Sequence, residues 1–180
     1  LVVAIQRGGL TALTLMALIL ERNTFNNSSN PDAGLGGFAV ALVLSGLGIT
    51  MGAIITPPAT RYIDRFTWSR SAMVAAAVMP IVFALTLNEF TLILMGFLTG
   101  MAGQAVKVTN DAIVQQSTSD IYRGRVFAVY DVVVNAAIVS GALLCAAFLP
   151  TSGLSRSVPF GIALVYLFAA LILMNKRIFK

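Results

Sequence analysis

The chain has 180 residues, of which 58% are apolar, 11% are charged and none is histidine. A soluble domain holds roughly 45–50% apolar residues and needs far more polar surface to cover its core, so this composition excludes a soluble globular protein and predicts an α-helical integral membrane protein. The net charge of +5 does not indicate nucleic-acid binding, because the basic residues lie between apolar segments and not along one face.

Six apolar segments are long enough to cross a hydrocarbon core of about 30 Å. The polar run 21–23 is expected to end the first segment. The Thr-Pro-Pro run 56–58 is expected to end the second, because proline cannot continue the helical hydrogen-bond ladder. Pro80 lies inside the third segment and predicts a kink there. The predicted spans of this all-α, six-helix transmembrane bundle are residues 1–20, 35–55, 68–87, 90–116, 125–149 and 159–175.

Basic residues are distributed unequally between alternate loops. One set of loops holds only Arg22 and Arg156, whereas the other set and the end of the chain hold most of the positive charge. The positive-inside rule places the second set in the cytoplasm, so we expect a multi-pass protein of the cell membrane with both chain ends cytoplasmic. The basic residues of the second set are Arg61, Arg65, Arg70, Arg123, Arg125, Lys176, Arg177 and Lys180.

Glycines spaced four residues apart form small faces on two of the predicted helices. Gly48 and Gly52 lie in the second span, and Gly96 and Gly100 lie in the fourth. Such faces let helix backbones approach closely where lipid offers no hydrophobic drive for association. Packing inside the bundle is favoured over a dimer interface, since any compact bundle needs faces of this kind.

Four polar residues are predicted to lie at a similar depth in the membrane and to form a polar layer. Arg7 lies about 20 Å from the outer end of its span, and Asp131 lies about 9 Å from the cytoplasmic end of its own span. Gln104 reaches the same level, and Asn135 follows Asp131 by one turn. The layer either lines a path for substrate or protons, or contains a structural ion pair between Arg7 and Asp131.

Near the cytoplasmic end of the fourth span, Lys107 and Asp111 are spaced i, i+4, and Gln115 follows after another four residues. The three side chains are therefore expected on one helix face. An interfacial ion pair is favoured over a functional role. Cys145 is the single cysteine and there is no histidine, so neither a disulfide nor a usual metal site is expected. No nucleophile–base pair and no phosphate-binding loop is present, so no enzyme activity and no cofactor is expected.

The stretch 111–144, DAIVQQSTSDIYRGRVFAVYDVVVNAAIVSGALL, resembles the junction between the tenth and eleventh helices of bacterial major facilitator superfamily transporters. RGGL at 7–10 with LILERNTF at 18–25 is similar to the seventh helix. TRYIDRFTWSR at 60–70 resembles a degenerate G-x-x-x-D-R-x-G-R loop motif, in which Asp64 and Arg65 match and threonines replace the glycines. The matching residues of the long stretch are Gln115, Arg123, Gly124, Arg125, Val126, Phe127, Tyr130, Asp131 and Asn135.

The resemblance implies one half of a transporter built from two inverted three-helix repeats. It implies the C-terminal half of a longer chain, whose N-terminal six-helix half would be the partner across a substrate cavity. The expected activity is secondary transport by alternating access, coupled to protons or to another ion. The resemblance to this branch implies export of small molecules or drugs. Membrane lipids would surround the bundle. A scaffold or sensor that retains the fold without transport is the alternative, and a membrane enzyme acting on lipids lacks the residues it would need.

Overall fold

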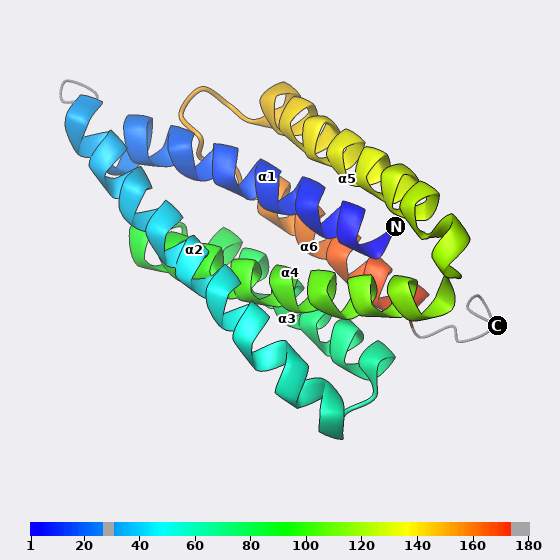
Figure 1. Ribbon diagram of the computed structural model, residues 1–180. Coiled ribbons are helices and arrows are strands. Elements are labelled where there is room, and N and C mark those ends of the chain that lie inside the picture. The colour runs from blue at the N-terminus through cyan, green and yellow to red at the C-terminus, as the bar shows by residue number, and fades with distance from the viewer. Residues whose placement is uncertain (27–30, 174–180) are drawn as a thin grey trace.

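The computed structural model describes residues 1–26 and 31–173, and every element in those ranges is a helix (Figure 1). This confirms the predicted all-α bundle. The first five helices are long and apolar enough to cross a membrane when η1 is counted with α1, whereas α6 is a shorter apolar helix. The predicted end of the sixth span at Asn175 and the basic residues after it lie outside the described ranges. The helices are α1 (Val2–Leu20), the π-helix η1 (Glu21–Phe25), α2 (Pro31–Tyr62), α3 (Arg65–Thr86), α4 (Glu89–Ser117), α5 (Asp120–Phe148) and α6 (Ser157–Ile172).

α1 ends at Leu20, as predicted, but the chain continues for one wide turn as η1, with Glu21 fully buried. The predicted end of the second helix at residues 56–58 is wrong. The second helix runs through Pro57 and Pro58 to Tyr62. Proline removes its own N–H but holds a helical φ, so two prolines near a helix end cost ladder bonds without forcing the chain to turn. The Thr56 hydroxyl, which donates to Gly52 O at 2.7 Å, reinforces the turn just before them.

The helix contacts are related by a pseudo-symmetry between the two halves of the bundle. Contacts made by α1, α2 and α3 recur when these helices are replaced by α4, α5 and α6 respectively, and the reverse. α2 packs along α4, and in the equivalent place α5 packs along α1. α3 packs along α4, and α6 contacts α1 in the equivalent place but much less extensively. The pairs α1–α4 and α3–α6 are unchanged by the exchange. This is the contact pattern that two inverted three-helix repeats produce.

The two outer pairs of this exchange, α2–α4 and α1–α5, both meet through glycines. A Cβ added to Gly48 would lie 2.1 Å from Phe97 O, and one added to Gly52 would lie 2.3 Å from Met101 O. On the other side, a Cβ on Gly141 would lie 2.1 Å from Gly8 O. The glycine faces of α2 and α4 therefore pack inside the bundle, as expected. The corresponding α1–α5 contact was not anticipated.

α2 and α5 are the least covered helices, and they lie on opposite flanks of the bundle (Figure 1). In the most apolar stretch of α5 only 6% of residues are buried, and in that of α2 17% are. The corresponding share is 44–50% in α3, in α4, and in α1 taken together with η1. Their exposed faces carry many large apolar side chains, such as Leu47 and Val132. The core of the bundle consequently lies between α1, α3, α4 and α6.

Candidate functional site

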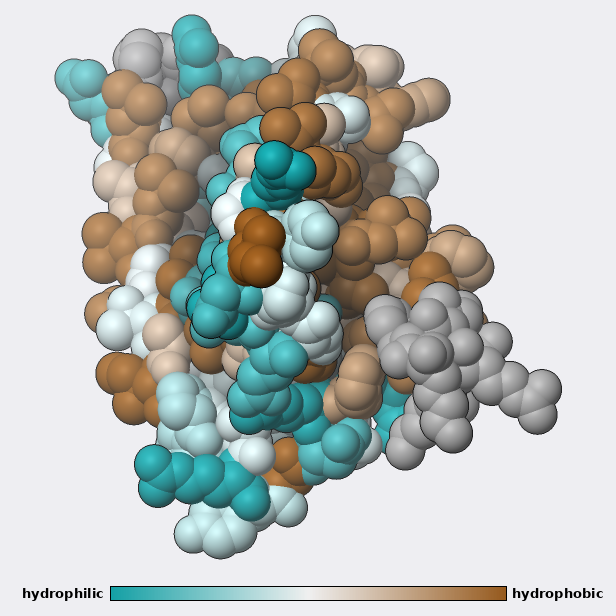
Figure 2. Space-filling view, turned by 45° about the vertical axis from the view of Figure 1, so that its right-hand side comes forward, coloured by the Kyte–Doolittle hydropathy of each residue, from teal (hydrophilic) through white to brown (hydrophobic). Residues whose placement is uncertain are grey.

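The α2–α3 loop, the α4–α5 loop and the start of α1 lie at one end of the bundle (Figure 1). We call it the basic end, because Arg61, Arg65, Arg123 and Arg125 belong to it. Figure 2, which turns this side toward the reader, shows hydrophilic residues gathered in a band down the middle with hydrophobic residues on both flanks. The candidate functional site lies further from this end, where polar side chains of α4 bond to α1 and to α5.

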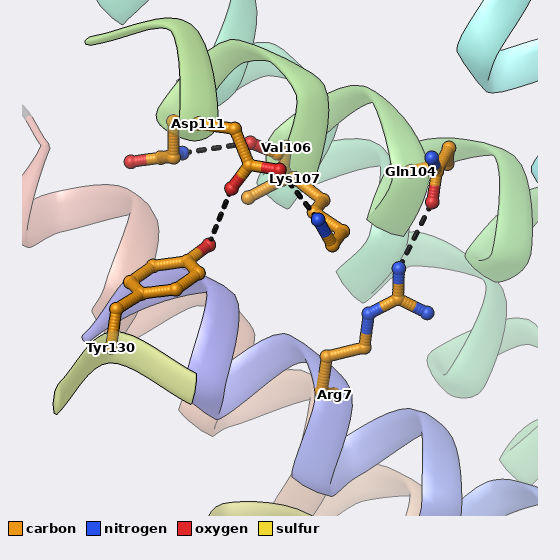
Figure 3. Close-up of polar contacts among 7 residues, drawn as sticks. Arg7, Gln104, Val106, Lys107, Asp111 and Tyr130 are labelled. Atoms are coloured by element: carbon orange, nitrogen blue, oxygen red, sulfur yellow. Dashed lines mark hydrogen bonds and ion pairs between the residues drawn. The ribbon is translucent and has the colours of Figure 1, made fainter. Parts of the chain in front are cut away.

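Asp111 is the centre of this site. Its Oδ2 lies 2.5 Å from Lys107 Nζ on the preceding turn of α4, and its Oδ1 accepts a hydrogen bond of 2.9 Å from the Tyr130 hydroxyl of α5 (Figure 3). The predicted i, i+4 pair is therefore formed, and it is joined to a second helix. Both carboxylate oxygens are engaged by donors from two helices, which fixes the orientation of this side chain.

Arg7 reaches from α1 to α4, where its Nη2 donates to Gln104 Oε1 at 2.9 Å (Figure 3). Gln104 is neutral, and the described ion pairs of the chain do not include Arg7. A guanidinium group has five donors, so most of its hydrogen-bonding capacity remains for another partner. We call Arg7, Gln104, Lys107, Asp111 and Tyr130 the polar cluster.

The predicted ion pair between Arg7 and Asp131 is wrong. The side of α5 that meets α1 and its neighbours is marked by Tyr130, Ala137, Gly141 and Cys145, which recur at helical spacing. Asp131 is one residue further along, about 100° around the helix at 3.6 residues per turn, and is exposed. The prediction used depth along the helix alone and did not fix the rotation of α5 about its axis.

Asp131 and Asn135 lie together on the exposed face of α5. Asn135 Nδ2 donates to the backbone oxygen of Asp131 at 2.8 Å, and both side chains are exposed. The structure thus divides the predicted polar layer in two. Arg7 and Gln104 join inside the bundle, whereas Asp131 and Asn135 face outward from it.

The residues of the loop motif hold the α2–α3 turn and its neighbours together. Asp64 caps α3, since its Oδ2 accepts from Thr67 N at 3.1 Å and from the Thr67 hydroxyl at 3.3 Å. Thr67 stands at a motif glycine and uses its hydroxyl in this cap. Arg65 donates to Gln116 Oε1 at the end of α4. The bond between Arg65 and Gln116 therefore links α3 to α4 at the basic end.

Arg123, Gly124 and Arg125, which were predicted to lie in a cytoplasmic loop, belong to the first turns of α5, where they are exposed and make local contacts. Arg123 pairs with Asp120 at 2.6 Å and reaches the backbone oxygen of Gln115 at 3.5 Å. Exposed pairs of this kind contribute about 0–1 kcal/mol. A Cβ on Gly124 would meet nothing within 4 Å, and Arg125 is exposed. None of these residues belongs to the polar cluster.

Sequence reasoning missed a second polar contact between α1 and α4, beside the polar cluster. Gln6 is fully buried and its Nε2 lies 3.4 Å from Thr99 O, while the Tyr166 hydroxyl of α6 donates to Gln6 O at 2.9 Å. Gln6 Oε1 and the Thr99 hydroxyl have no partner among the described residues. A search for uncharged polar residues at the depth of Arg7 would have found Gln6 as the adjacent residue.

Comparison with known proteins identifies the family of the chain. Neither a protein-family model nor a solved structure matches the chain. Two curated relatives, from Mycobacterium bovis and Mycobacterium tuberculosis, are both named as uncharacterized MFS-type transporters. Each is 31% identical over 140 residues, which cover 78% of this chain but 31% of the relative, so the chain spans about a third of the length of the relatives it matches. This identity along most of a six-helix membrane bundle places the chain in the major facilitator superfamily.

Proposed function

We propose that the chain forms the C-terminal six-helix half of a secondary transporter. Its transport path would lie between a second six-helix half and the face on which α1 and α4 lie between the exposed helices α2 and α5 (Figure 1). The observation that carries this proposal is the exposure of Asp131. It lies eleven residues into a 29-residue apolar helix, about 16 Å from its start. A carboxylate at the centre of a helix facing lipid costs about 2.5–3.5 kcal/mol on insertion scales, so such residues face protein or a water-filled cavity.

The relative lengths support a second half. The aligned region covers under a third of the two curated relatives, which leaves room for another bundle of this size. The exchange of α2 with α5 places the two uncovered helices in equivalent positions, as a surface shared with a pseudo-symmetric partner requires. The flux path would then pass Asp131 and Asn135 and reach the polar cluster.

The orientation, coupling and direction of transport are part of the same proposal. The positive-inside rule makes the basic end cytoplasmic. The described chain offers carboxylates near the path and carries no nucleotide-binding loop, which supports coupling to an ion gradient, most simply of protons. Export of small molecules or drugs follows from the resemblance of the R-G-R-V-F and Y-D segments alone. The rival function, a scaffold or sensor, is expected to have its polar layer closed off from water, and the exposure of Asp131 and Asn135 speaks against it.

The test is transport by the full-length protein in proteoliposomes under an imposed pH gradient, with a panel of lipophilic compounds and a pH-sensitive dye inside. We expect compound-dependent proton movement in the wild type and at least a tenfold loss in Asp131→Asn. Asp120→Asn is the matched control, because Asp120 is exposed at the start of α5 and pairs only with Arg123 among the described residues. Equal loss in both variants, or no gradient-dependent flux with any compound, would contradict the proposal.

A further inference from the structure

Glu21 is a fully buried carboxyl group at the end of the bundle opposite the basic end, with an exposed fraction of 0%. It begins η1, the wide turn that the backbone bond from Asn26 N to Glu21 O closes at 3.3 Å. The Asn26 amide also donates to Glu21 Oε2 at 3.0 Å and to Glu21 O at 3.1 Å. Single π-helical turns of this kind are frequent at functional sites.

Two glycines of α2 make the space in which this carboxyl group lies. A Cβ on Gly37 would lie 2.3 Å from Glu21 Oε2, and a Cβ on Gly34 would lie 2.8 Å from the Cα of Arg22. They are one turn apart, so the same face of α2 lies directly against η1. The carboxyl group is therefore enclosed by backbone and by Asn26. A larger residue at Gly37 would displace the carboxyl group, and one at Gly34 would displace the backbone of η1.

The charges around Glu21 do not stabilise an anion. The charged group that acts on it electrostatically is Glu89, an acid at the start of α4. Arg22 next to it and Asp32 at the start of α2 are exposed, and neither takes part in a described ion pair. Glu21 Oε1 is buried and has no hydrogen-bond partner among the described residues. A buried carboxylate without a cation and with one unbonded oxygen is unfavourable, whereas the neutral acid avoids the cost of the buried charge.

We propose that Glu21 is a proton-binding site, occupied while η1 is closed against α2. A proton from water at this end of the bundle binds the carboxylate, with no other bond made or broken, and the same proton leaves when the turn opens and water reaches the carboxyl group. An exposed glutamate is ionised at pH 7, so the enclosure by Gly34, Gly37 and Asn26 is what retains the proton.

η1 is also bonded to the loop that joins α5 to α6. Asn23 Nδ2 donates to Thr151 O at 2.6 Å and the Thr24 hydroxyl donates to Ser152 O at 2.6 Å. The turn that holds the proton thus touches the start of α2 and the segment following α5, the two least covered helices. Opening of η1 would alter both contacts. The use of this proton in transport rests on the proposed function, whereas the binding of the proton does not.

The test is infrared spectroscopy of the full-length protein in lipid nanodiscs with the glutamate carboxyl carbons labelled with ¹³C. Residues 1–180 contain two glutamates, Glu21 and Glu89, and the difference between wild type and each variant isolates each signal. We expect a carboxylic-acid C=O band at pH 7 that is absent in Glu21→Gln and retained in Glu89→Gln. A spectrum in which the Glu21 signal is entirely that of a carboxylate at pH 7 would overturn the proposal.

Thermal unfolding between pH 6 and pH 9 gives a second reading. The folded state holds a proton that the unfolded chain releases, so the wild type should lose stability as the pH rises. Glu21→Gln, which cannot titrate, should lose less and should exceed the wild type in melting temperature at pH 9. Identical pH dependence in the two proteins would count against the site. A carboxylic-acid band in a protein without flux would support the proton site and overturn the proposed transport. Flux without the band would support the proposed transport and overturn the proton site.

Discussion

On α5, a step of one residue decides which side chains meet α1 and which face outward. Tyr130 lies on the inner side and binds Asp111, whereas Asp131 faces outward. Depth could be estimated from the sequence, because each residue adds about 1.5 Å. The rotation of the helix could not, because it is set by the contact of Gly141 with the backbone of Gly8. The sequence therefore identified the correct residues for Lys107 and Asp111 but the wrong partner for Arg7.

A double-mutant cycle should show that Arg7 is coupled to Gln104. We expect Arg7→Met and Gln104→Leu to have a coupling energy of about 1.5–3 kcal/mol, the range for a hydrogen bond to a charged group. The cycle of Arg7→Met with Asp131→Asn is the control, and its energies should add to within about 0.5 kcal/mol. Reversible unfolding in mixed micelles measures both. A larger coupling energy of Arg7 with Asp131 than with Gln104 would show that the ion pair predicted from the sequence forms after all.

The elements show the same division between what sequence patterns specify and what packing specifies. Apolar length predicted six helices, and the i, i+4 glycines predicted close packing, which the structure shows between α2 and α4. The π-helical turn after Leu20 was not predicted, and the predicted end of the second helix at Pro57 was wrong, because charge and proline were interpreted as helix stops. Glu21 is enclosed by α2, and α2 continues past its prolines to Tyr62. The enclosure of Glu21 arises from a neighbouring element, which the local sequence does not show.

Gly48→Ala should destabilise the α2–α4 crossing. The new Cβ would lie 2.1 Å from Phe97 O, so the helices must separate, and we expect a loss of about 1–3 kcal/mol in unfolding free energy. Gly46→Ala in the same helix is the matched control, since nothing lies within 4 Å of its Cβ position. That variant should be neutral or slightly stabilising because alanine favours helix. Equal effects of the two substitutions would show that α2 does not pack on α4 as described.

Thr56→Val tests the link between α2 and α3 beside the prolines. Thr56 is fully buried, and its hydroxyl donates to Gly52 O and accepts from Trp68 Nε1 at 3.4 Å. Leaving the indole N–H without its partner should cost about 1 kcal/mol, measured by unfolding in detergent. Thr50→Val is the control, because Thr50 is exposed and bonds only within its own helix, to Gly46 O. A larger loss for Thr50→Val would show that the α2–α3 bond does not form.

At the scale of the whole molecule, the exchange of the two three-helix repeats explains why two flanks remain uncovered. The resemblance of the R-G-R-V-F stretch implied this inverted architecture, and the helix contacts follow it. Composition alone does not separate a face that meets lipid from one that meets protein, because both are apolar. Under the proposed function, the exposed Asp131 on α5 marks a face that meets protein, and its exposure could be seen only in the structure.

The orientation predicts which loops an impermeant thiol reagent reaches in intact cells. Single cysteines at Thr151 and Ser119 are both placed in exposed loops, at the end near η1 and at the basic end respectively. We expect labelling of the first in intact cells and of the second only after the cells are opened. The native Cys145 is buried and donates its thiol to Ala12 O, so it should contribute little background. Labelling in the opposite sense would reverse the topology.

The contact of Gly141 with Gly8 makes α5 a lever. Backbone meets backbone at this point, and Cys145 is the one buried residue of the helix. Asp131 lies ten residues to one side, about 15 Å along the helix, and Thr151 lies ten residues to the other. If α5 tilts about this contact, Asp131 and the loop at Thr151 would move in opposite directions, and a displacement of Asp131 would reach the loop bonded to η1 with its direction reversed.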